Sequence, residues 1–266
     1  MGSDANIAGA LTSHRTLTLV GIGLLAGFFS ALFGVGGGIV MVPLLITLVA
    51  MDAKVATATS LATIIFTSVV GVISHGALGN VEWGYALLIG IPAVLGLLGG
   101  LWVKERVSSR QLTLAFAAVL VAVGIWLIVE PGGRSTVPSL HVADAVGVAA
   151  IGIGAGLLAG LFGVGGGVLF VPALALIIGL PQVHAEATSL LAIIPVALIG
   201  SWRQHQAGMV RWRDAVTMGA ASAATAVAGA LVADVTPGRT LTILFALLVI
   251  LTGGQLAARA WREAAR

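Results

Sequence analysis

The sequence predicts an all-α integral membrane protein made of two inverted-topology repeats, each with about five helical segments. Of its 266 residues, 59% are hydrophobic and 9% are charged, whereas soluble domains carry about 25% charged residues. The string Phe-Gly-Val-Gly-Gly-Gly occurs at 33–38 and again at 162–167. Ala-Thr-Ser-Leu follows at 58–61 and at 187–190, with the same offset of 129 residues. Such self-similarity indicates an internal duplication.

Apolar runs mark the helical segments of each half. In the first half they cover about 17–33, 39–50, 56–74, 84–102 and 111–129, and in the second about 146–162, 168–179, 187–201, 215–233 and 240–258. Most are long enough to cross a hydrocarbon core of about 30 Å. The second run of each half is too short, so it is either a buried half-helix or one arm of a re-entrant hairpin. We expect a first repeat at 1–130, an external linker at 131–145 and a second repeat at 146–266, together forming one transmembrane domain.

The placement of lysine and arginine favours opposite orientations for the two halves. The stretch 75–83 holds neither residue, whereas 103–110 holds three; in the second half, the loop after Ser201 is rich in arginine and 234–239 holds only Arg239. By the positive-inside rule, equivalent loops then face opposite sides of the membrane. Five crossings per half, or three crossings and one re-entrant hairpin, satisfy this inversion. Both termini are expected in the cytoplasm, in a multi-pass plasma (inner) membrane protein.

Each triple glycine is predicted to break a membrane helix, because glycine weakens a helix interior by roughly 1 kcal/mol relative to alanine. The helix that restarts after the break has free N–H groups and about half a positive charge at its N-terminus. Two such N-termini near the membrane midplane would hold an anion without a buried arginine. The candidate substrate-binding glycines are Gly36, Gly37, Gly38, Gly165, Gly166 and Gly167. Close helix packing is the alternative explanation for these glycines.

Paired hydroxyl residues extend the candidate substrate site. Thr59 and Ser60, with their equivalents Thr188 and Ser189, lie at the start of apolar runs. Their hydroxyls can donate to a bound oxyanion, or can cap a helix and bond to its own carbonyls. His75 and His205 are weaker candidates for proton coupling, because imidazole titrates near physiological pH; exposure at the membrane interface is the alternative for both.

The sequence also argues against several other functions. The chain has no cysteine, and no His/Glu pair has the spacing of a metal site. We therefore expect no enzyme, no metal and no cofactor. There is no basic run for nucleic acid, and no Gly-Lys-Ser/Thr phosphate loop. Transport would then be secondary or passive, with the lipid bilayer and a small anionic substrate as partners and no ATPase subunit.

The doubled pattern at 27–43 and 156–172, Gly-x-Phe/Leu-x-x-x-Phe-Gly-Val-Gly-Gly-Gly-x-x-x-Val-Pro, resembles the TauE/SafE sulfite-exporter family. The resemblance covers nearly the whole chain. It implies a bacterial-type plasma-membrane transporter that exports sulfite or an organosulfonate such as sulfoacetate, with the glycine strings and the Thr-Ser pairs at its core. We expect alternating access, with the anion between the repeats and one repeat rocking against the other. An uptake permease or a channel for a small oxyanion or carboxylate would have the same sequence features.

Overall fold

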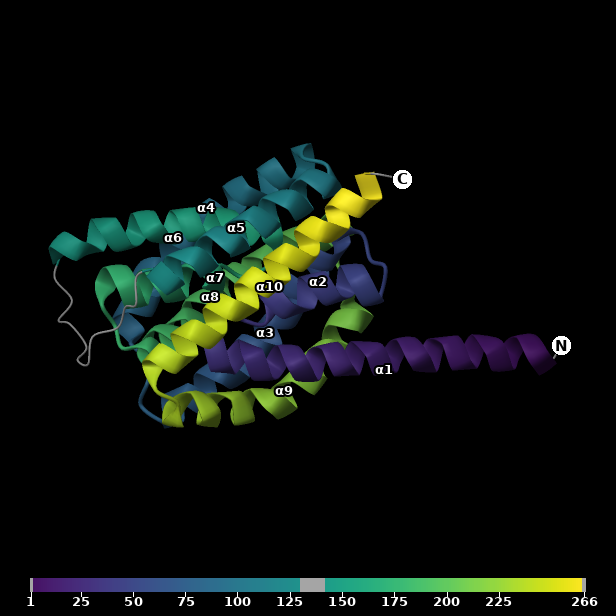
Figure 1. Ribbon diagram of the computed structural model, residues 1–266, viewed down its shortest axis with the longest axis horizontal. Coiled ribbons are helices and arrows are strands. Elements are labelled where there is room, and N and C mark those ends of the chain that lie inside the picture. The colour runs from purple at the N-terminus through teal and green to yellow at the C-terminus, as the bar shows by residue number, and fades with distance from the viewer. Residues whose placement is uncertain (1, 130–141, 265–266) are drawn as a thin grey trace.

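The computed structural model describes residues 2–129 and 142–264, which form helices and contain no strand (Figure 1). The first half holds α1 (Gly2–Phe33), α2 (Gly38–Leu48), α3 (Ala53–Ala77), α4 (Trp83–Arg106) and α5 (Ser109–Val129). The second half holds α6 (Val142–Phe162), α7 (Gly167–Pro172), the π-helical turn η1 (Ala173–Ile178), α8 (Gln182–Gln206), α9 (Trp212–Val235) and α10 (Gly238–Ala264). The predicted all-α membrane fold is confirmed. Most of the predicted linker at 131–145 lies outside the described residues.

Most predicted apolar runs lie within a helix of the structure that extends beyond the run at one or both ends. Among the described residues, seven helices are long and apolar enough to cross a membrane, in α1, α3, α4, α5, α8, α9 and α10. The second segment of each half is short, at Gly38–Leu48 and Gly167–Ile178. In Figure 1, α2 folds back beside α1 toward the end where the chain begins. The first half therefore has an α1–α2 hairpin followed by three long helices, and whether the hairpin is re-entrant stays a prediction.

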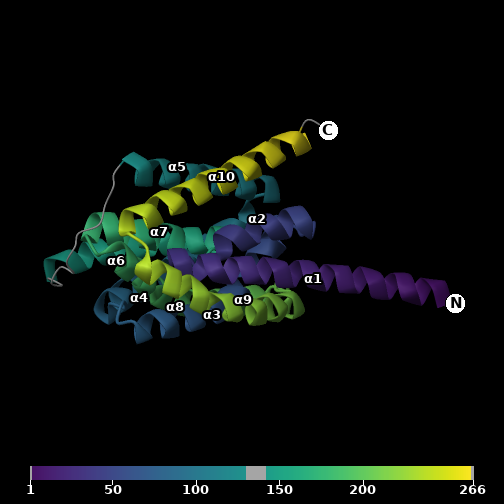
Figure 2. The same cartoon turned by 60° about the horizontal axis from the view of Figure 1, so that its bottom comes forward.

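Helices pack mainly on helices of the other half. The main contacts join α1 to α9, α4 to α6, and α5 to α10 (Figures 1 and 2). The pairs α1–α9 and α6–α4 are equivalent under the 129-residue offset, and α3 packs on its own equivalent α8. In Figure 1, α1 and α6 run in opposite directions, as do α5 and α10. An inverted repeat requires this arrangement; its orientation in a membrane stays a prediction.

Glycines bring the backbones of the paired helices into contact. A Cβ added to Gly156 of α6 would lie 1.9 Å from the Ala93 carbonyl oxygen of α4. At the equivalent position in the other pair, a Cβ on Gly27 of α1 would lie 2.1 Å from the Ser222 carbonyl oxygen of α9. Lipid tails are as apolar as leucine, so membrane helices associate through this kind of close packing. The glycine faces therefore specify which helices pair.

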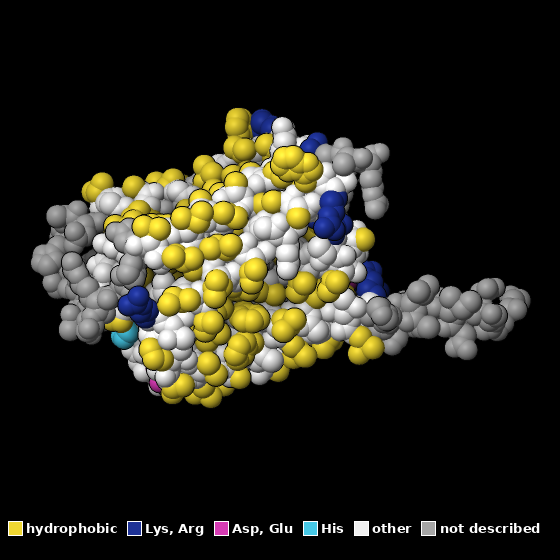
Figure 3. Space-filling model, in the orientation of Figure 1, with side chains coloured by type: hydrophobic (Ala, Val, Ile, Leu, Met, Phe, Trp, Pro, Cys, Tyr) yellow, Lys and Arg dark blue, Asp and Glu magenta, His cyan; other side chains and the backbone are white. Residues whose placement is uncertain are grey.

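The surface has the character of a membrane protein (Figure 3). Hydrophobic side chains cover most of the face shown, and most of its lysine and arginine gathers at the end toward which both chain ends point. Large apolar side chains such as Ile91, Leu95 and Leu251 are more than 60% exposed. Such exposure is costly in water, whereas it is favourable in lipid.

Replacing Gly156 with valine is expected to destabilise the protein, because the new side chain would separate α6 from α4. Gly154 lies on the same helix with no heavy atom within 4 Å of an added Cβ, so Gly154→Val is the matched control. Thermal unfolding in detergent, followed by size-exclusion chromatography, should show a melting temperature lower by several degrees for Gly156→Val only. Equal melting temperatures for the two variants would contradict the glycine contact.

Candidate functional site

The two glycine strings lie against each other in the interior. We call the segments 34–38 and 163–167 the paired breaks; all their residues are buried. A Cβ on Gly38 would lie 2.6 Å from the Val164 Cα, and one on Gly167 would lie 2.5 Å from the Val35 Cα. The structure thus brings the two breaks into contact at Gly38 and Gly167. Only glycine permits two backbones to approach this closely. The contact between the two breaks therefore accounts for glycine at the contact positions.

In each break, the glycine just before the new helix has a left-handed backbone conformation. Gly37 has φ 82° before α2, and Gly166 has φ 91° before α7. The Gly37 carbonyl accepts hydrogen bonds from the N–H groups of Val40 and Met41, at 3.1 and 3.0 Å. The Gly166 carbonyl does the same for the equivalent residues 169 and 170, at 3.0 Å each. The first amides of both helices precede any carbonyl that could bond them within the helix, so both N-termini carry positive potential.

The first turns of α3 and α8 press on the breaks from the opposite half. A Cβ on Gly34 would lie 2.4 Å from the Glu186 Cα, and one on Gly163 would lie 2.6 Å from the Thr57 Cα. Glu186 is fully buried, and its Oε1 accepts a hydrogen bond from Gln182 Nε2 at 2.9 Å. Each break is therefore enclosed by its own half and by a helix start from the other.

The two equivalent serines differ in their hydrogen bonds. Ser189 Oγ donates to the Gly34 carbonyl at 2.7 Å. Ser60 Oγ is buried and has no hydrogen-bond partner among the described residues. Since an unpaired buried hydroxyl costs free energy, Ser60 holds a polar group that a ligand could satisfy. Ser189 thus contacts a break, and of the two serines only Ser60 lacks a hydrogen-bond partner among the described residues.

The threonines of the Thr-Ser pairs have another role. Thr188 Oγ1 accepts the Glu82 N–H at 3.0 Å, and Thr59 Oγ1 accepts the Arg211 N–H at 3.2 Å. Glu82 and Arg211 immediately precede α4 and α9. Adjacent residues on a helix point about 100° apart, so Thr and Ser of one pair cannot face the same place. The threonine hydroxyls hold the helix starts of the opposite half.

The sequence did not reveal several residues that line the breaks. Ile64 Cγ2 would lie 2.9 Å from a Cβ on Gly36 and 3.4 Å from one on Gly165. Its equivalent Ile193 would lie 2.7 Å from the same Cβ on Gly165. Thr67 Oγ1 donates to the Gly36 carbonyl at 2.9 Å. Helical spacing is the sequence signal that could have identified these isoleucines. Ile64 and Ile193 each follow the serine of their half by four residues and so lie on the same helix face as that serine.

The two histidines lie apart from each other. His75 is buried in the last turn of α3, with Nε2 2.8 Å from the Ala31 carbonyl oxygen of α1. His205 is exposed at the end of α8, where its Nδ1 accepts the Trp212 Nε1–H at 2.9 Å. Proton coupling through either residue stays a prediction.

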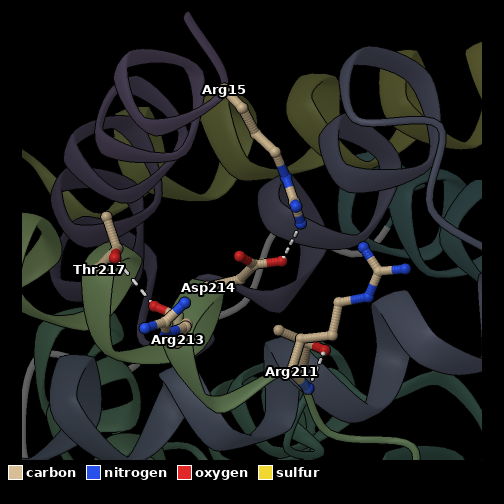
Figure 4. Close-up of polar contacts among 6 residues, drawn as sticks. Arg15, Arg211, Arg213, Asp214 and Thr217 are labelled. Carbon is tan, nitrogen blue, oxygen red and sulfur yellow. Dashed lines mark hydrogen bonds and ion pairs between the residues drawn. The ribbon is translucent and has the colours of Figure 1, made fainter. Parts of the chain in front are cut away.

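Basic side chains surround the start of α9 at the end of the molecule where the chain begins (Figure 4). Arg15 of α1 donates to the Asp214 carboxylate of α9, and Thr217 Oγ1 donates to the Arg213 carbonyl at 2.8 Å. Arg15, Arg213 and Asp214 line a cavity of about 640 Å³. This ion pair joins the first helix to the ninth and balances the charge of the buried carboxylate.

Comparison with known proteins agrees with this architecture. The family model of the sulfite exporter TauE/SafE matches residues 19–256. A probable membrane transporter protein of Xylella fastidiosa is 29% identical over 212 residues, covering 77% of this chain and 80% of that protein. The probable membrane transporter protein YunE of Bacillus subtilis is 29% identical over 261 residues, covering 90% and 96%. No solved structure shows a significant match.

The family match spans both breaks and extends from α1 into α10. Both relatives carry the name of a probable membrane transporter, and neither carries the name of an enzyme. With its broken helices and apolar exterior, the chain belongs to the TauE/SafE sulfite exporter family of membrane transporters.

Proposed function

We propose that the protein is a secondary transporter that exports a small sulfur-containing anion, such as sulfite or an organosulfonate like sulfoacetate, across the plasma membrane. The observation that carries this proposal is the meeting of two buried helix starts at the paired breaks. The name of the family supports the choice of sulfite and its relatives as the substrate class.

The proposed site suits a compact oxyanion. Amide groups at the starts of α2 and α7 and the Ser60 hydroxyl would donate to its oxygens, at the positive ends of both helices. Ile64 and Ile193 pack on the glycines and would keep water from the anion. Neutral donors hold an anion more weakly than a buried arginine does, and a carrier needs this ready release.

Transport from this site requires a conformational change. The glycines of both breaks are buried, so the site must open to each side in turn, as alternating access demands. We propose that the change moves the short α2 and the segment at Gly167–Ile178 against the surrounding helices. A membrane potential of about 100 mV, negative inside, would favour the exit of each negative charge by about 2.3 kcal/mol.

Flux through purified protein in liposomes tests the proposal. Sulfite, sulfoacetate, sulfate and acetate are compared under gradients of each sign, with Gly37→Val and Gly166→Val beside the wild type. Both glycines have positive φ and close neighbours, whereas Gly79 has positive φ and open space, so Gly79→Val controls for backbone strain. We expect sulfite or sulfoacetate flux to fall at least tenfold in the first two variants only.

Normal flux in Gly37→Val and Gly166→Val would show that the breaks do not bind the substrate. Flux that proceeds equally well inward under an inward gradient, with counterflow, would favour an uptake permease; failure of counterflow would favour a channel.

Alanine variants of the two serines should distinguish a role in ligand binding from a role in stability. Ser189→Ala leaves the buried Gly34 carbonyl without its donor, so the free energy of unfolding should fall by about 1–3 kcal/mol. Ser60→Ala removes a hydroxyl that has no partner, so stability should be kept. Its affinity for sulfite should fall by roughly 2–10-fold, the worth of one neutral hydrogen bond. Chemical denaturation and titration calorimetry measure the two effects; unchanged sulfite affinity in Ser60→Ala would remove Ser60 from the site.

The inverted orientation is tested with single cysteines in a chain that has none. Leu78 and Ala207 are equivalent, exposed residues after α3 and α8. An impermeant thiol reagent added to intact cells should label Leu78→Cys and leave Ala207→Cys unlabelled until the cells are opened. Labelling of both from one side would disprove the inversion.

A further inference from the structure

A second polar cavity lies where α4 and α8 end, away from the paired breaks. Its volume is about 350 Å³, and its lining includes Trp102, Lys104, Glu105, Arg203, Gln204 and Met209. These residues come from the last turns of two helices of different halves and from the loop that follows α8. The positive-inside rule would place this end in the cytoplasm.

Two of the lining side chains are buried nitrogen donors without partners. Lys104 is 1% exposed and Gln204 is 5% exposed. Within the described part of the chain, neither Lys104 Nζ nor Gln204 Nε2 has a hydrogen-bond partner. A buried ammonium group without a counter-charge lowers stability, and a cavity beside it offers room for the missing partner.

The carboxylates near Lys104 are occupied or exposed. Asp52, before α3, accepts hydrogen bonds from the Lys54 N–H and from Ser109 Oγ, both at 2.8 Å. Glu105 lines the cavity and its side chain is exposed. Lys54 Nζ reaches the Glu105 carbonyl at 3.4 Å and adds positive charge nearby. The charge of Asp52 therefore acts on Lys104 from nearby, but among the described residues no carboxylate accepts a hydrogen bond from Lys104 Nζ.

Two comparisons within the molecule set this cavity apart. In the larger cavity beside α9, the buried carboxylate of Asp214 is already paired with Arg15 (Figure 4). Under the repeat, the equivalent of Lys104 is Ala233, and the equivalent of Gln204 is His75, whose Nε2 contacts the Ala31 carbonyl. The lysine therefore occurs at one end of the duplicated fold only, whereas at the other end His75 Nδ1 is also buried without a hydrogen-bond partner among the described residues.

We propose that this cavity binds a small oxyanion through Lys104 Nζ and Gln204 Nε2, with the exposed Arg203 at its mouth. Ammonium and amide donors suit the oxygens of sulfate or of a phosphate ester. The oxyanion could be a free anion of the cytoplasm or the phosphate of a lipid headgroup. Trp102 lines the cavity and is exposed, with the Arg106 guanidinium 3.5 Å from its ring centre. Tryptophan is enriched at the membrane–water interface, where lipid headgroups lie. The proposal does not require an anion at the paired breaks.

Equilibrium dialysis with radiolabelled sulfate tests the site, using full-length protein in phosphatidylcholine nanodiscs. The dissociation constant should rise at least tenfold in Lys104→Gln and several-fold in Gln204→Leu. Lys54→Gln removes the chain's other lysine, which adds positive charge nearby without lining the cavity, so it should weaken sulfate binding far less than Lys104→Gln does. Ser60→Ala should also keep this binding, so failure at the breaks and failure here give different results.

A second experiment, in nanodiscs of another lipid composition, identifies the source of the oxyanion. In nanodiscs that contain phosphatidylglycerol, a lipid ligand would compete with sulfate, and mass spectrometry would find it retained by the wild type and lost from Lys104→Gln. Without such competition, the site takes a free anion. If Lys104→Gln and Gln204→Leu change neither sulfate binding nor lipid retention, or if the wild type binds neither, the proposal is wrong.

Thermal stability separates a binding lysine from a structural one. Lys104→Met removes an unpaired buried charge, so its melting temperature without ligand should equal or exceed that of the wild type while sulfate binding is lost. A lower melting temperature together with lost binding would assign Lys104 to the packing of α4 and would contradict the proposal.

Discussion

Backbone N–H and C=O groups cannot remain unpaired in hydrocarbon, and the rest of the structure depends on this constraint. A membrane helix that stops at a glycine string exposes such groups, so the break must be covered by protein. Here each break is covered by the other break and by a helix start from the opposite half. The need to cover the unpaired backbone groups of both breaks accounts for the contact between the breaks and for their enclosure by α3 and α8. The anion site that we propose would use the groups left over at the two helix starts.

Much of this arrangement follows from sequence reasoning because duplication and hydrophobicity are strong signals. The order of the helices and the short second segments could be predicted, whereas most helices extend beyond the predicted apolar runs because their ends are polar. The different hydrogen bonding of Ser60 and Ser189 could not, because it depends on which carbonyl the second serine meets after packing. The same holds for Lys104. Its position near a helix end predicts an interfacial lysine, and only the packed structure shows that it is 1% exposed.

The packing also limits which parts can move. One half could rock as a block only by separating α1 from α9 and α4 from α6, where glycines hold the backbones together. Membrane helices in such contact lose dispersion energy and backbone contacts on separation without any compensating hydrophobic gain. A moving unit that keeps these pairs intact therefore has helices from both halves. The short α2 and the segment at Gly167–Ile178 make fewer of these contacts and are better placed to shift.

The cross-pairing of helices has a consequence for folding. The glycines of α1 pack on the backbone of α9, and those of α6 pack on the backbone of α4. Each glycine face therefore stays uncovered until its partner helix is present. Most of the chain must therefore leave the ribosome and enter the membrane before the first helix can be packed. Neither half is an independent folding unit, so we expect the whole chain to unfold in one cooperative step. The sequence contains two copies of one repeat, but close packing between helices of the two copies joins them into one structural unit.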